Sequence, residues 1–296
     1  MSVPRHASYS QVSSYLTCGK QFQLERVVGV KGKPALYFAG GTTFHVLAEN
    51  YDRGEWDGSN VEAEVARVWD EEIFKEVTDL PTSEWLKAGR VSKVWPNRED
   101  GEWWLASLPI QINAYIKWRA EHPAWTFWAA PDEGEGAVAG IELPVSFDVD
   151  GIPVVGAIDR VLVINGQLHI MDLKSGSREP EGTLQLAMYA TALEAMYGIR
   201  PEWGSYYMSR KGDLSSPKYL GNWGTAQVHD AVRQYRRGVA AEVFIPHESN
   251  LCNGCRVAQW CTVRGGKDAA GVDPLSGSSH TYLPIVTVSS TEGVPA

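Results

Sequence analysis

The 296-residue sequence predicts an α/β protein in which a central sheet is flanked by helices and preceded by a helical region. Up to about residue 135 the apolar residues follow a helical spacing, and from about residue 138 they alternate as they do in strands. Two hairpin signals, Asp150–Gly151 and Asn165–Gly166, divide this second stretch into three strands. A helix, a strand and another helix follow, which is an order typical of an α/β core.

The N-terminal region, residues 1–135, is expected to be helical. Its first helix is entered through Ser8 or Ser10, whose hydroxyls can cap a helix. Its second helix follows the pair Gly40–Gly41 and can be capped within Thr42–Thr43. The four expected helices cover residues 7–30, 39–54, 61–78 and 101–121.

The core sheet is expected within residues 136–245. The amphipathic helix that follows the three strands ends at Gly198, a residue that favours helix C-termini. The expected strands cover residues 139–150, 152–164, 167–176 and 202–210, and the expected helices cover 181–199 and 225–243. Residues 246–267 form a cysteine-rich segment that is expected to pack back on the N-terminal region. Residues 268–296, rich in Ser, Gly, Thr and Pro, read as a flexible tail.

Composition and charge narrow the class of protein. A formal charge of −9 argues against a general polyanion binder, although a local basic groove is compatible with it. No apolar run reaches the length of a membrane span, and the N-terminus lacks a signal-peptide core. We therefore expect a cytoplasmic protein without membrane contact. In that reducing compartment the four cysteines are better explained as metal ligands than as disulfides.

Two aspartates and a lysine are expected to share one small site. Asp172 and Lys174 alternate on the same face of their strand, with Leu173 on the other face. A hairpin that turns at Asn165–Gly166 sets Asp159 opposite Asp172. Carboxylates of this kind bind hard divalent cations such as Mg²⁺, and a lysine beside the ion can orient water or stabilise developing charge. The alternative is a surface salt bridge between Asp172 and Lys174.

Three polar residues accompany these groups. His45 lies on the second expected helix and can supply a further ligand to Mg²⁺ or Mn²⁺. Gln185 and Tyr189 lie four positions apart, on one face of the helix that follows the third strand. Their polar ends can hold a phosphate or the lysine. A packed histidine and an ordinary core tyrosine are the alternatives.

Three cysteines are clustered and the fourth is distant. Cys252, Cys255 and Cys261 have the spacing C-x2-C-x5-C, and Cys18 lies 234 positions before Cys252. Ligation by four thiolates suits a zinc ion and a 4Fe–4S cluster equally well. Free cysteines or a redox-active C-x-x-C are the alternatives.

Taken in order, the motifs resemble a known family. "GAIDRV", "DLKSG" and "QLAMYA", with an upstream G-x-x-x-H, resemble the PD-(D/E)XK nuclease superfamily in its RecB-like branch. The early cysteine with a late C-x2-C-x5-C is similar to the iron–sulfur exonucleases of that branch, namely the CRISPR-associated exonuclease and the AddB-type helicase–nucleases. The resemblance covers residues 8–264, with the Trp-rich region 55–135 outside any motif.

The resemblance implies a fold and a set of residue roles. The core would be restriction-endonuclease-like, with an N-terminal helical region and a C-terminal Fe–S cluster segment. Lys174 would be catalytic, with Gln185 and Tyr189 in the motif that follows it. The implied Mg²⁺ or Mn²⁺ ligands are Asp159, Asp172, the Leu173 carbonyl and His45, and the implied 4Fe–4S ligands are Cys18, Cys252, Cys255 and Cys261.

The function expected from this resemblance is that of a metal-dependent deoxyribonuclease. An exonuclease that hydrolyses linear or single-stranded DNA from its ends, in recombination, repair or end processing, is the first hypothesis, with a helicase or recombination protein as a partner. An endonuclease of the same fold and a DNA-end-binding subunit without catalysis are the alternatives.

Contacts with DNA require cations and can use aromatic rings. The cationic candidates are Arg160, Arg178, Arg210, Lys211, Arg233 and Arg237. The candidates for stacking on unpaired bases are Trp85, Trp95, Trp103 and Trp104.

Overall fold

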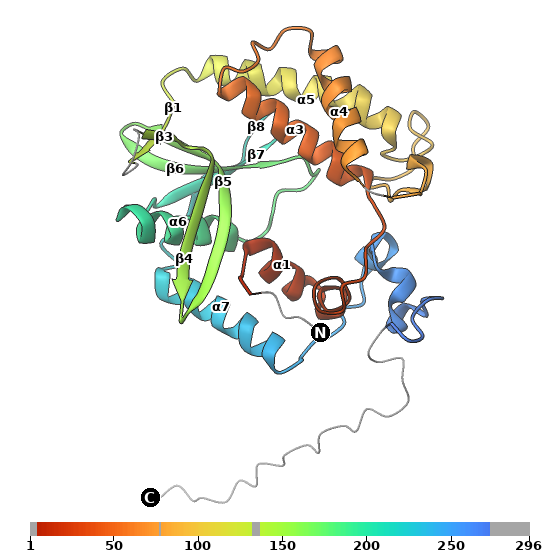
Figure 1. The fold of residues 1–296 in the computed structure, drawn as a ribbon. Coiled ribbons are helices and arrows are strands. Elements are labelled where there is room, and N and C mark those ends of the chain that lie inside the picture. The colour runs from red at the N-terminus through yellow and green to blue at the C-terminus, as the bar shows by residue number, and fades with distance from the viewer. Residues whose placement is uncertain (1–4, 77, 132–136, 273–296) are drawn as a thin grey trace, which may run out of the picture.

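The computed structural model describes residues 5–76, 78–131 and 137–272, and a seven-stranded mixed sheet forms its centre (Figure 1). The strand order is β1-β5-β6-β7-β8, with β4 paired to β5 and β9 paired to β7. Only the β6–β7 pair is parallel, and α6 connects its two strands. The strands of this sheet are β1 (Thr126–Phe127), β4 (Ile141–Val149), β5 (Ile152–Ile164), β6 (Gln167–Lys174), β7 (Trp203–Met208), β8 (Asp213–Leu214) and β9 (Lys218–Tyr219). A separate pair joins β2 (Ala129–Pro131) to β3 (Ala137–Ala139).

Helices cover both faces of the sheet, which confirms the predicted α/β architecture (Figure 1). One core lies between the sheet and α3 (Leu36–Asp52), α4 (Val61–Lys75) and α5 (Gly101–Glu121). The other core lies between the sheet and α1 (Tyr9–Thr17), α6 (Leu184–Tyr197) and α7 (Thr225–Ala240). Strand β6 shows why both faces are covered: Met171 and Leu173 belong to the first core and Ile170 to the second, because successive side chains alternate.

The hairpin between β5 and β6 has the predicted register. Asn165 and Gly166 both have positive φ, at 52° and 78°, as a two-residue type I′ turn requires. Ile164 pairs with Gln167 and Arg160 with Met171, so the next opposed positions are 159 and 172. The turn therefore brings the two aspartates together.

The first expected helix, over residues 7–30, is wrong as a single element. The chain leaves α1 at Cys18, which has extended φ and ψ of −161° and 106°, and continues as α2 (Gly19–Phe22) and the π-helix η1 (Gln23–Val28). A Cβ on Gly19 would lie 2.7 Å from the backbone nitrogen of Ile245. The helix breaks because a distant segment crosses it at this glycine.

The second expected helix begins earlier than predicted. Helix α3 starts at Leu36, so Gly40 lies inside it, and Thr43 donates its hydroxyl to the Ala39 carbonyl instead of capping. A Cβ on Gly40 would meet ring carbons of Trp104 at 2.2 Å. The glycine is needed for close packing of α3 on α5, which a helix-start rule does not consider.

This packing predicts opposite effects for two neighbouring substitutions. Gly40→Ala should lower the free energy of unfolding by about 1–3 kcal/mol, because the added methyl overpacks a filled core. Gly41→Ala is the matched control, because among the described residues its Cβ would meet only the Ser175 side chain, with the hydroxyl at 3.0 Å. It should be neutral or stabilise by up to about 1 kcal/mol through helix propensity. Urea unfolding measures both, and equal effects would contradict the packing explanation.

The cysteine-rich segment lies against the N-terminal region (Figure 1). The Lys33 amide donates to the Arg256 carbonyl at 2.9 Å, and the Arg256 guanidinium donates to the Lys33 carbonyl at 2.8 Å. Leu24 and Val257 share a small apolar cluster. The segment consists of the 3-10 turns η3 (Asn250–Gly254), η4 (Ala258–Trp260) and η5 (Thr262–Arg264).

Two further predictions concern the C-terminal tail and the absence of a membrane span. The predicted tail lies mostly outside the described residues, which end at 272. In the described part of the chain, no helix is both long enough and apolar enough to cross a bilayer.

Candidate active site

The carboxylates of Asp159 and Asp172 come from adjoining strands and are both buried. Asp159 Oδ2 accepts a hydrogen bond of 2.6 Å from the Leu173 amide, which fixes one oxygen and leaves the other available. Lys174 Nζ lies 2.7 Å from Asp172 Oδ2, so the buried carboxylate forms an ion pair with the lysine.

Helix α3 brings His45 to the same place from the other layer. Its Nε2 lies 3.2 Å from the Leu173 carbonyl, and since a carbonyl only accepts, Nε2 carries the hydrogen. The lone pair of Nδ1 then faces the carboxylate, 3.8 Å from Asp159 Oδ2. The Leu173 carbonyl keeps a second lone pair, so its predicted role as a ligand is compatible with this contact.

Glu142 joins this group and was missed by the sequence analysis. Ligand atoms of Glu142, His45 and Asp159 all lie within 4.8 Å of one another. Glu142 has a φ of 46°, a strained value for a non-glycine residue inside a strand. A signal for it was present: a hairpin turning at Asp150–Gly151 sets position 142 opposite 159, by the rule that related Asp159 to Asp172.

These donors fit a hard divalent cation. Oxygen ligands with one imidazole suit Mg²⁺ and Mn²⁺, and ligands on one ion with bonds of roughly 2.1 Å lie up to about 4.2 Å apart. The separations among His45, Glu142 and Asp159, within 4.8 Å, approach that limit. A small side-chain movement would therefore let these three side chains bind one ion, and Asp172 lies beside them.

The pKa shifts of the site's side chains show that the site favours the binding of a cation. Burial, and then the neighbouring Asp159, raise the pKa of Asp172 to about 7. Burial followed by Asp159 also raises the pKa of Glu142, and burial raises the pKa of Asp159. Burial lowers the pKa of His45, which favours the neutral imidazole that binds metals. Carboxylates crowded in this way repel one another until a cation binds.

Helix α6 holds the lysine in position. Lys174 Nζ donates to Gln185 Oε1 at 2.9 Å, and Gln185 Nε2 donates to Tyr189 Oη at 3.1 Å. Helix α6 follows β6 directly, so its first turn returns Gln185 to the end of that strand. The structure thus brings together all of the residues predicted for catalysis and metal binding.

Comparison with known proteins identifies the family. The family model for the PD-(D/E)XK nuclease superfamily matches residues 6–262. The chain belongs to this superfamily. The match spans both layers of the fold, including the residues of the site. Membership of the PD-(D/E)XK superfamily implies a phosphodiester-hydrolysing nuclease that uses a divalent metal.

Relatives of this PD-(D/E)XK protein occur in mycobacterial viruses. The Gene 69 proteins of Mycobacterium phages D29 and L5 are each 29% identical to it, over 277 and 293 residues. Each match covers 86% of this chain and 96% of the relative. Among solved structures, that of SSO0001 aligns with a TM-score of 0.34 and 10% identity, covering 86% of this chain and 93% of the other.

The side chains of the PD-(D/E)XK site have separable tasks. When bound, a divalent metal supplies a Lewis acid that lowers the pKa of water and neutralises phosphoryl charge. His45, Glu142, Asp159 and Asp172 are the side chains that would hold it. Lys174, whose side chain is 27% exposed, can reach a phosphoryl oxygen or the attacking water from its place beside Asp172.

Glu142 gives a direct test of the metal site. Glu142→Gln should raise the Kd for Mn²⁺ at least about tenfold, because a charged ligand is lost from a half-buried site. Calorimetric titration of Mn²⁺ into the protein measures this. Glu49→Gln is the matched control, since Glu49 lies one turn after His45 but pairs with Arg53 at 2.8 Å. An unchanged Kd in the Glu142 variant would remove Glu142 from the ligand set.

One predicted DNA contact is wrong and others are already paired. Arg160 is fully buried, with its Nε 2.6 Å from Asp52 Oδ2, so it cannot reach a phosphate. It belongs to an internal ion network, and its partner lies 108 positions earlier. Arg233 pairs with Asp150 at 2.6 Å on the surface. Arg178, Lys211 and Arg237 are exposed.

Arg210 supports the chain just after the end of β6. Its guanidinium pairs with both carboxylate oxygens of Glu99, at 2.8 and 2.9 Å, and its Nε donates to the Ser175 carbonyl at 2.7 Å. It also lies 4.6 Å from the ring centre of Trp103. The predicted DNA contact by Arg210 would have to break this arrangement.

The tryptophans predicted to stack on bases divide into two groups. Trp85 and Trp104 are 4% and 0% exposed, so they are core residues and this prediction is wrong for them. Trp95 and Trp103 are half-buried.

Proposed function

We propose that this PD-(D/E)XK protein is a DNA exonuclease of the RecB-like branch, similar to its iron–sulfur exonucleases. The observation that carries the nuclease assignment is the convergence of Asp159, Asp172, Lys174 and His45 on one buried centre. The approach of the late cysteines to Cys18 supports the finer assignment to the branch.

The four cysteines are proposed to hold a 4Fe–4S cluster. A cavity of about 200 Å³ is lined by Cys18, Cys252 and Cys255. The His247 amide donates to Cys18 Sγ at 3.4 Å, and the Cys252 thiol lies 3.9 Å from the His247 carbonyl. Burial raises the pKa of the Cys255 thiol, and the nearby Glu25, Cys18 and Cys261 raise it further. The thiols of both chain regions are therefore close neighbours.

Four thiolates suit a zinc ion and a 4Fe–4S cluster equally well. The resemblance to the iron–sulfur exonucleases is what favours the cluster. Anaerobically purified protein should therefore absorb broadly near 400 nm, and a colourless, zinc-rich preparation would contradict this proposal.

The exonuclease assignment is tested by the topology of the substrate. With Mg²⁺ or Mn²⁺ the protein should digest linear DNA, and EDTA should stop the reaction. Circular single-stranded DNA should survive, because it has no ends. Digestion of the circle would indicate an endonuclease of the same fold, and binding of ends without cleavage would indicate a non-catalytic subunit. Such an activity would serve recombination, repair or end processing, with a helicase or recombination protein as a possible partner.

A further inference from the structure

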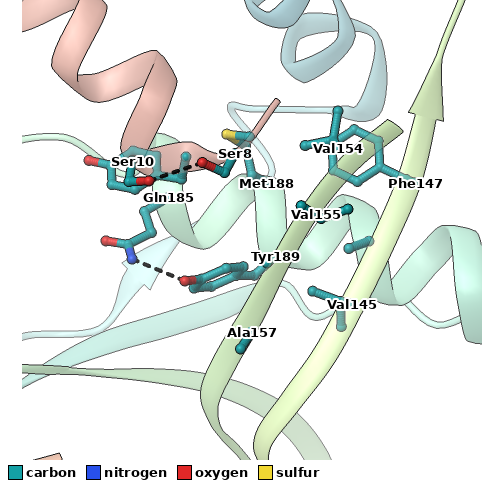
Figure 2. A pocket seen from close by; sticks show the side chains of 13 residues that line it. Ser8, Ser10, Val145, Phe147, Val154, Val155, Ala157, Gln185, Met188 and Tyr189 are labelled. Atoms are coloured by element: carbon teal, nitrogen blue, oxygen red, sulfur yellow. Dashed lines mark hydrogen bonds between the residues drawn. The ribbon is translucent and has the colours of Figure 1, made fainter. Parts of the chain in front are cut away.

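A cavity of about 220 Å³ opens beside the catalytic centre (Figure 2). It lies between the start of α1, the β4–β5 hairpin and α6. Val145, Phe147 and Val154 form one wall from the two strands, and Met188 and Tyr189 form another from α6.

The cavity shares residues with the site of hydrolysis. Gln185, which accepts the hydrogen bond from Lys174, and Tyr189, which is bonded to Gln185, both line it. Ala157 precedes Asp159 by two residues on β5, or roughly 7 Å along a strand. A group in the cavity would therefore lie next to a phosphate held at the catalytic centre.

The lining indicates which part of a nucleic acid would enter. In the described part of the chain none of the residues that line the cavity is charged, so the lining does not suit a phosphate or a metal ion. Its walls are aliphatic and aromatic, while the hydroxyls of Ser8 and Ser10 lie at one end and the Gln185 amide lies near Tyr189 (Figure 2). Apolar walls with a few polar groups at the edge suit a neutral planar ring.

The size of the cavity limits it to one ring system. Pockets for drug-sized ligands span roughly 300–1,000 Å³, and this cavity, at about 220 Å³, is smaller. It has room for a single base and none for a base pair. The two serines and one glutamine offer few directed contacts, so recognition would depend on shape and stacking more than on base identity.

We propose that this cavity accepts the unpaired base next to the scissile phosphate, so that the enzyme cleaves nucleotides in single-stranded form. This inference rests on the proposed nuclease function and names its substrate class. A duplex end would have to fray before its terminal nucleotide is cut.

An abasic oligonucleotide tests this proposal with the wild-type protein. Single-stranded substrates that carry either thymine or a tetrahydrofuran abasic residue at one internal position are digested with Mn²⁺, and the products are resolved by gel. The wild type should cut at the abasic position at least about fivefold more slowly than at thymine. Equal rates at both positions would overturn the base pocket and leave the proposed nuclease intact. No digestion of any DNA would instead overturn the proposed nuclease.

A filled pocket gives the second arm of the test. Ser10→Trp, at the end of the cavity, should lower the rate at thymine to the rate at the abasic position, so that the ratio falls to about one. Leu16→Trp is the control, since Leu16 lies on the same helix, is 65% exposed and is outside the cavity lining. It should keep the wild-type ratio. A wild-type ratio in the Ser10 variant would also overturn the proposal.

Discussion

Replacing Asp172 with Asn is expected to lower kcat for DNA hydrolysis by at least about a thousandfold, or roughly 4 kcal/mol of transition-state stabilisation. The substitution keeps the shape of the side chain and removes the charge that would bind the metal. It also removes the partner that lies 2.7 Å from the Lys174 ammonium. Single-turnover digestion of end-labelled DNA measures the loss.

The same variant should fold at least as well as the wild type. Asp172 is 2% exposed, and burial raises the pKa of its carboxyl to about 7, so the charged form is costly in the fold. A neutral amide there relieves the cost of a buried charge, so the Tm should be equal or higher. Asp230→Asn, at an exposed position on α7, is the control for general effects. A variant that digests DNA as fast as the wild type would contradict the active site described above.

Replacing Cys18 with Ser is expected to remove the proposed cluster and to destabilise the whole protein. A link from Cys18 to the late cysteines closes a loop of more than 200 residues, and loss of such a link costs several kcal/mol, about 5 as an idealised figure. The contacts of Leu24 with Val257 and the two hydrogen bonds between Lys33 and Arg256 would then hold the segment. We expect loss of the absorption near 400 nm together with a fall in Tm of 5 °C or more, as roughly follows from that energy.

Asn253, which follows Cys252 in the sequence, supplies the control for this variant. Asn253 lies between two cysteines of the late motif and is exposed. Asn253→Ser leaves every thiol in place and should keep both the absorption and the Tm. A Cys18 variant that retains the chromophore would show that this cysteine is not a ligand.

Local turn chemistry explains why much of the fold and site was predictable. The Asn165–Gly166 turn sets the register of β5 against β6, and the register places Asp159 beside Asp172 without any distant contact. The helix after β6 then returns Gln185 and Tyr189 to Lys174.

Errors arose where distant residues decide local structure. The break at Cys18 lies where the chain near Ile245 crosses Gly19, and Gly40 lies inside α3 because it packs against Trp104. Arg160 was expected to bind DNA, and this was wrong. Its partner, Asp52, lies on another element, and no residue next to Arg160 in the sequence indicates that the two form a buried ion pair. Helix propensity and residue spacing describe residues that are close in the sequence, so they do not predict contacts between distant elements.

The crossing of residues 244–245 over Gly19 has a consequence for the order of events during translation. Ribosomes add about 5–20 residues per second, so Cys18 is made roughly 10–50 s before Cys261. For most of that interval the amino-terminal turn lacks the backbone of Ile245, against which Gly19 packs. Assembly of the proposed cluster would therefore wait until Cys261 has been made, and a polypeptide released before that point would carry an incomplete set of thiols.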